Sequence, residues 1–133
     1  MRLDKLSQMS DVMRALYDRE FRVIAAILAE ESDLRGKLNQ LDAQIADNLE
    51  LGDNALSLNV VGAQFLWQGW TSRTRRQLNG DLAQVMAKKL VAMDRVRIAF
   101  GRQRAVEMMM TTEQVALKQR RAKQRDINLL SLG

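Results

Sequence analysis

The sequence predicts an all-α protein: a long antiparallel two-helix coiled-coil hairpin with a projecting C-terminal helical extension. The 133-residue chain has no proline, and it is rich in Leu, Ala, Met, Gln and Arg. These unbranched side chains favour helix because they lose little rotamer freedom there. Apolar residues recur at spacings of three and four along the first 45 residues, and a glycine with turn-forming residues follows. We therefore expect one hairpin over residues 1–133, with helices at about 3–51 and 59–126 and a turn at about 52–58.

The apolar residues of the first helix define a predicted seam, the row that faces the second helix. Its members are Leu6, Met9, Met13, Leu16, Val23, Ile27, Leu34, Leu38, Leu41 and Ile45. Tyr17, Ile24 and Leu28 widen this row. Glu20 and Glu30 occupy two slots of the seam, and the step from Glu30 to Leu38 predicts a small phase slip. We expect the two carboxylates to reach solvent laterally or to pair with arginines of the facing helix, which are Arg95, Arg97 and Arg104.

The segment after Leu51 carries the residues of a turn. Gly52 is a natural helix stop, and Asp53 and Asn54 favour a turn. Asn59 is the predicted N-cap of the second helix, with Ser57 as the alternative. A connection of this length favours a hairpin over two independent domains.

The second helix has a less regular apolar pattern than the first. Its one credible break is Asn79-Gly80-Asp81, because Asn-Gly is a turn dipeptide. Both a continuous helix and a helix broken near 79–81 remain open at this point.

A turn centred near Ala55 predicts the pairing of the two helices. Leu6 would lie near Arg104, and Leu49 near Val61. Residues beyond about Met108 would then have no partner within the chain. They would form an extension of roughly 20 residues, or about 30 Å.

Charge divides the chain unequally. Residues 1–51 hold seven basic and ten acidic side chains, whereas residues 52–133 hold fourteen basic and six acidic ones. The opposite net charges of the two parts favour the hairpin. The positive surplus of the second part predicts an acidic partner.

Composition argues against enzyme and metal chemistry. The chain has no Cys and no His, so the thiolate ligands and the commonest general base and metal ligand are missing. No phosphate-binding loop or helical metal motif is present. We therefore expect no catalytic residue, no metal and no cofactor. No stretch is apolar enough for a secretory or membrane-spanning segment, and we expect a cytoplasmic protein.

Three groups of residues are candidate partner-binding sites. The first is cationic and is formed by Lys118, Arg120, Arg121, Lys123 and Arg125. The second is the pair Met108 and Met109, since thioethers adapt to varied partners. The alternative for Met108–Met110 is one core methionine and two incidental ones. The third is the pair Trp67 and Trp70, either an interface anchor or packing near the turn.

The layout resembles the flagellar export protein FliJ and the YscO proteins of type III secretion. The resemblance covers the whole chain and rests on its length, its helix–turn–helix layout, its Met/Gln/Arg/Leu-rich texture, and stretches such as residues 78–83 and 99–105. It implies a coiled-coil stalk that binds the hexameric export ATPase, contacts the membrane export gate and escorts export chaperones. Such a protein could also be peripheral at the inner-membrane export apparatus.

Two other functions remain open. The chain could be a basic coiled-coil adaptor for nucleic acid, although residues 101–133 lack the aromatic side chains that stack on bases, which makes nucleic acid an unlikely partner. It could also be a structural coiled coil that forms a homodimer, because two helices alone bury limited apolar area.

Overall fold

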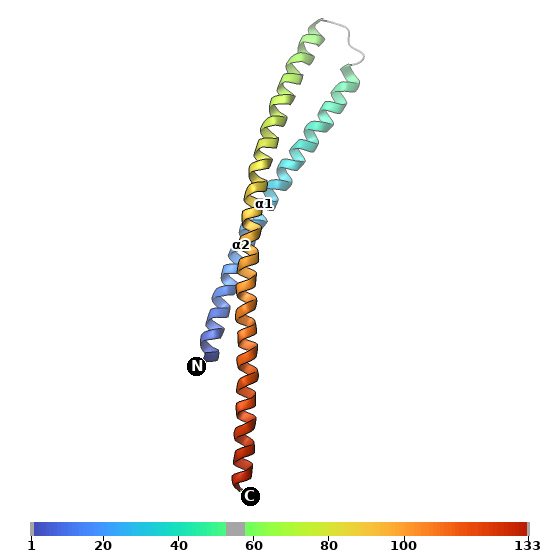
Figure 1. Ribbon diagram of the computed structural model, residues 1–133. Helices are drawn as coiled ribbons and strands as arrows, with labels where there is room; N and C mark the ends of the chain where they lie inside the picture. Colours follow the sequence, from blue (N-terminus) through green and yellow to red (C-terminus); the bar gives the residue numbers. More distant parts are fainter. Residues whose placement is uncertain (1, 53–57, 133) are drawn as a thin grey trace. The chain divides into compact units, whose positions relative to one another are not determined.

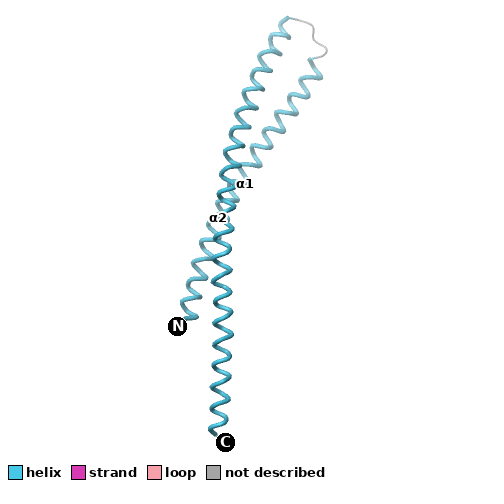
Figure 2. Tube along the Cα trace, in the orientation of Figure 1, coloured by secondary structure: helices cyan, strands magenta, loops and turns pink. Residues whose placement is uncertain are grey.

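The computed structural model describes residues 2–52 and 58–132, and both stretches are helical. Helix α1 spans Arg2–Gly52 and helix α2 spans Leu58–Leu132 (Figure 1). Every described residue belongs to one of these two helices (Figure 2). The helices pack against each other, so the predicted all-α hairpin class is confirmed. In the described residues, no helix has a stretch that is both long and apolar enough to cross a bilayer.

The helix ends differ from the prediction in two places. Helix α1 ends at Gly52 as expected, but Asn59 lies inside the first turn of α2 and is not its N-cap. The competing cap Ser57, and most of the predicted turn, lie outside the described residues. Helix α2 continues to Leu132, six residues beyond the predicted end at Asp126. No proline or glycine follows Asp126 before Gly133, so nothing in the sequence stops the helix earlier.

The chain divides into two units, and each helix contributes to both. The first unit combines α1 up to Val23 with α2 from Met93 onward, and the second contains residues 24–92. In the first unit Tyr17 stacks on Phe100, with ring centroids 5.8 Å apart. In the second, Glu31 pairs with Lys89 and Asp42 pairs with Arg75. The partner number on α2 falls as the number on α1 rises, as a hairpin requires.

The shielded residues of α1 follow an uninterrupted repeat of three and four. They are Leu3, Leu6, Ser10, Met13, Tyr17, Glu20, Ile24, Ile27, Glu31, Leu34, Leu38, Leu41, Ile45 and Asn48. We call this row the α1 seam. The predicted phase slip after Glu30 is therefore wrong. Met9, Leu16 and Val23 are exposed, and the seam uses the residue that follows each of them. At Met9 and Leu16 the prediction chose the more apolar of two neighbours, whereas the seven-residue repeat selects the residue that follows.

The buried residues of α2 are small. Thr71, Val85, Ala92, Ala99 and Val106 are buried, and they fall at multiples of seven residues from one another. Small side chains let two helices approach closely. The buried Thr71 hydroxyl donates a hydrogen bond to the Gln68 carbonyl at 2.9 Å, so this polar atom is satisfied.

The pairing register differs from the prediction. Tyr17 meets Phe100 instead of Met93, and Glu31 meets Lys89 instead of Asn79. The shift is seven residues in the first case and ten in the second, or roughly two to three helical turns. Leu6 is therefore not opposite Arg104, nor Leu49 opposite Val61. The prediction counted from an assumed turn centre, whereas side-chain pairing along the seams sets the true register.

Leu41 and Leu49 provide a matched test of the α1 seam. Leu41 is 4% exposed and Leu49 is 61% exposed. We expect Leu41→Ala to lower the free energy of unfolding by about 2–5 kcal/mol, because it leaves a cavity. Leu49→Ala should change it by less than about 0.5 kcal/mol. Urea unfolding followed by circular dichroism measures both, and equal effects would contradict the assigned seam.

Helix α2 passes through Asn79-Gly80-Asp81 without interruption. A Cβ atom added at Gly80 would meet nothing within 4 Å. We therefore expect Gly80→Ala to raise the free energy of unfolding by about 0.5–1 kcal/mol, since alanine loses less backbone entropy in a helix. Thermal unfolding measures the change. A loss of stability would indicate that this backbone is not helical in solution.

Candidate functional site

The cationic candidates Lys118, Arg120, Arg121, Lys123 and Arg125 all lie exposed on the last turns of α2. Shielded residues of α2 recur as far as Leu117, and after it only Ala122 is partly shielded, so the exposed end begins about nine residues later than the predicted Met108. From Lys118 to Leu132 it contains fifteen residues, or roughly 22 Å of helix. The five cations sit at its start.

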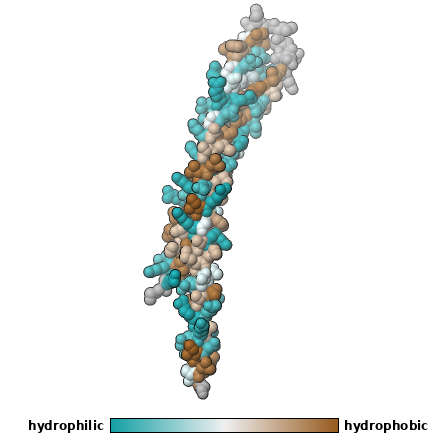
Figure 3. Space-filling model, viewed as in Figure 1, coloured by the Kyte–Doolittle hydropathy of each residue, from teal (hydrophilic) through white to brown (hydrophobic). Residues whose placement is uncertain are grey.

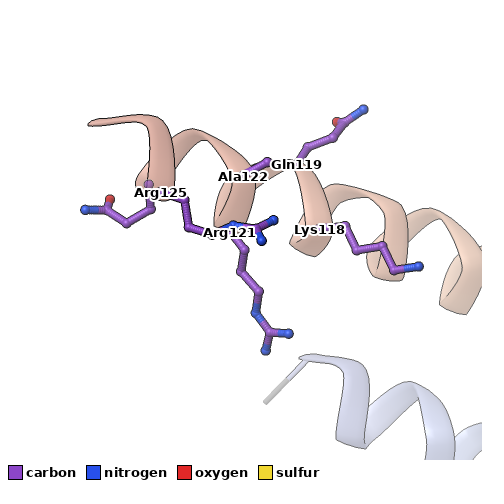
Figure 4. A pocket seen from close by; sticks show the side chains of 6 residues that line it. Lys118, Gln119, Arg121, Ala122 and Arg125 are labelled. Atoms are coloured by element: carbon purple, nitrogen blue, oxygen red, sulfur yellow. The ribbon is translucent and has the colours of Figure 1, made fainter. Parts of the chain in front are cut away.

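The basic segment lines an open hollow at the end of the first unit. Lys118, Arg121, Ala122 and Arg125 line it together with Gln119 and Gln124. In Figure 4, Lys118 and Arg121 extend on the side of the first turns of α1, whereas Gln119 points the other way. Arg120 is held by Glu113 at 3.1 Å, and its side chain is still 64% exposed. This hollow displays cations and suits an anionic surface better than a small substrate.

The methionine candidates lie just before this segment on α2. Met108 is 65% exposed and Met109 48% exposed, whereas Met110 belongs to the shielded row. Three consecutive helical residues cannot share one face, so one faces α1 and two are available to a partner.

The tryptophan candidates belong to the second unit. Trp67 is partly shielded and Trp70 is 47% exposed. The structure therefore places the tryptophans in one unit and the methionines and cations in the other. It does not bring the three groups into one site.

Glu31 is a buried charged residue that the sequence prediction missed. Its carboxylate accepts a hydrogen bond from Lys89 at 2.9 Å and another from Arg35 at 3.1 Å. The predicted candidate Glu30 is exposed, and Glu20 is partly shielded. Among the ion pairs of residues 2–52 and 58–132, none joins Glu20 or Glu30 to Arg95, Arg97 or Arg104. An unbroken seven-residue repeat from Leu3 would have pointed to Glu31.

Lys89 lowers the pKa of Glu31. The hydrogen bond from Lys89 is the largest cause; desolvation opposes it, and Arg35 adds to the lowering. Both cations favour the ionised carboxylate, so the pair is compatible with a shielded position. Arg35 also contacts the Met86 sulfur at 3.6 Å. The cluster joins α1 and α2 within the second unit.

The described residues offer no evident metal site. They contain no group of three or more acidic side chains placed to hold a metal ion. No family model matches the chain, and no curated protein or solved structure is significantly similar to it.

The lowered pKa of Glu31 predicts a pH dependence of stability. In the unfolded chain this carboxylate titrates near its ordinary value of 4.5, and in the folded chain below it. Between these values the unfolded state binds more protons, so stability rises with pH there and is lost as the pH falls. We expect Glu31→Gln to lower the melting temperature above about pH 5, with the difference from the original chain shrinking as the pH falls from the unfolded pKa through the folded pKa.

Glu30→Gln is the matched control because Glu30 is the exposed neighbour on the same helix. It should leave the melting temperature nearly unchanged at every pH. Circular dichroism melts between about pH 3 and pH 7 compare the variants. If Glu31→Gln changed the melting temperature by the same amount at every pH, the electrostatic role of the pair with Lys89 would be contradicted.

Proposed function

We propose that this chain is a non-enzymatic antiparallel coiled-coil component of a flagellar or type III protein export apparatus. In this role it resembles the FliJ stalk, binds the hexameric export ATPase, contacts the export gate and escorts export chaperones. One observation carries the proposal: α2 continues past the region shielded by α1 and displays five cations on its exposed end. The protein acts in the cytoplasm, peripheral to the membrane machinery.

The packing supports the coiled-coil part of the proposal. The α1 seam keeps a spacing of three and four over its whole length, which is the pattern of knobs-into-holes packing. The pairs Glu31–Lys89 and Asp42–Arg75 favour helices that run in opposite directions. The hollow lined by Lys118, Arg121 and Arg125 is open to solvent and does not enclose a substrate.

The exposed helix end is suited to a ring-shaped partner. A single helix is about 10 Å wide and fits a narrow central opening. Lys118, Arg121 and Arg125 occupy one side of it, and acidic loops lining a ring would attract them. Attraction between exposed charges weakens as salt is added, because the Debye length shortens.

A pulldown with the purified hexameric export ATPase tests the proposal. Reversing three cations at the helix end (Arg121→Glu, Lys123→Glu and Arg125→Glu) should reduce capture of the ATPase by roughly tenfold or more at about 0.1 M salt. The matched control reverses three exposed bases of the second unit, Arg73, Arg76 and Lys88, to Glu. This control should retain capture.

Equal capture of all three proteins would remove the proposed role of the helix end. Binding to random duplex DNA would favour a nucleic-acid adaptor instead, if the salt dependence of the affinity corresponds to about four or more neutralised phosphates.

A further inference from the structure

The first unit carries exposed apolar side chains beside both seams. On α1, Met9, Val12, Leu16 and Val23 are each between 40% and 55% exposed. On α2, Ile98 and Met109 are also about half exposed. Isolated apolar residues on a surface are ordinary, but a contiguous set marks an interaction site. Brown and tan atoms form several clusters along the face seen in Figure 3.

The seven-residue repeat places these side chains on one side of the unit. Phe21 and Phe100 directly follow the shielded residues Glu20 and Ala99, and both rings pack on Tyr17. They therefore mark one side of the paired helices. Met9, Leu16 and Met109 directly precede the shielded residues Ser10, Tyr17 and Met110. Residues before and after a seam position lie on opposite flanks of it, so these three share the other side.

The rows that form this second side contain cations and no carboxylate. On α1 the two rows run through Arg2, Met9, Leu16 and Val23, and through Lys5, Val12 and Arg19. On α2 the corresponding rows between 95 and 116 run through Arg95, Arg102, Met109 and Ala116, and through Ile98, Ala105 and Thr112. The surface thus combines apolar side chains with cations, and Arg102 lies between Arg95 and Met109 in the same row. We call it the Leu16 face.

We propose that the Leu16 face binds an amphipathic helix of a partner protein, with Asp and Glu residues flanking its apolar stripe. The apolar stripe would pack on Leu16 and Met109, and the carboxylates would meet the arginines of the same face, such as Arg19 and Arg102. A second copy of this chain fits less well, because its own Leu16 face would bring cations onto cations. This inference concerns a different surface from Lys118–Arg125, so it does not depend on the proposed function.

A designed peptide probes the Leu16 face directly. The probe is a fluorescein-labelled helix of about 20 residues with Leu at spacings of three and four and Glu on both sides of that stripe. A second peptide has Lys in place of every Glu. Fluorescence anisotropy with the full chain should show saturable binding of the Glu peptide, weakened by salt, and much weaker binding of the Lys peptide.

Two triple variants assign the binding to the Leu16 face. Val12→Gln, Leu16→Gln and Met109→Gln together should weaken binding of the Glu peptide by roughly tenfold or more. The control removes three exposed leucines elsewhere, through Leu28→Gln, Leu90→Gln and Leu130→Gln. It should bind like the original chain. All six positions are exposed, so both variants should keep the helical circular dichroism spectrum.

Several outcomes would overturn the proposal. They are the absence of saturable binding of the Glu peptide, equal binding of both peptides, and equal losses in the two triple variants. Sedimentation that shows a dimer for the original chain and a monomer for the Leu16-face variant would identify a second copy as the occupant. Flotation with phosphatidylcholine–phosphatidylglycerol vesicles that is lost in that variant would identify a membrane surface. The Leu16-face variant keeps Arg121, Lys123 and Arg125. The ATPase pulldown therefore tests the proposed function independently of this inference.

Discussion

The uninterrupted seven-residue repeat of α1 is the constraint on which the rest of the structure depends. It gives each helix a narrow shielded row instead of a broad apolar face, because only two positions in seven face the other helix. Residues directly beside this row are then half exposed even when they are apolar. Met9, Leu16 and Val23 lie outside the α1 seam for this reason, although they are more apolar than Ser10 and Glu31 within it.

A repeating seam leaves the register of the helices ambiguous, and the charged pair Glu31–Lys89 resolves it. A slip of seven residues along α2 would place Leu82 or Val96 opposite Glu31, and neither can neutralise a carboxylate. Glu31 would then keep only Arg35, its neighbour on α1, and would lose its cationic partner on the facing helix. The Glu31–Lys89 pair therefore disfavours a slip of seven residues in either direction, and it acts on specificity of alignment more than on net stability.

The fold and part of its seam could be predicted from the sequence, because helix propensity and apolar spacing are local properties. Leu6, Met13, Ile27, Leu34 and Leu41 were assigned to the correct row. The prediction did not place Ser10 and Glu31 in the seam. Hydropathy favours Met9 over Ser10, and it does not distinguish Glu30 from Glu31. The register was missed for a different reason: pairing across the hairpin is nonlocal, and counting from a turn ignores which side chains satisfy one another.

Among the candidate sites, the exposed bases of 118–125 were identifiable from charge alone. The Leu16 face was not, because it becomes visible only once the seam is assigned to the correct residues.

The small side chains of the seam relate the fold to partner binding. Ala92 and Ala99 bring the backbones close but contribute little apolar area, and no large side chain in the described residues is fully buried. Stability from burial is roughly proportional to the apolar area removed from water, so a two-helix unit of this kind gains less than a larger bundle. A partner that binds only the folded hairpin adds to this stability by mass action. The apolar side chains left beside the seam supply the area for such a gain. The narrow packing thus limits the stability of the isolated hairpin. It also leaves apolar side chains exposed, and a partner that covers them stabilises the folded hairpin.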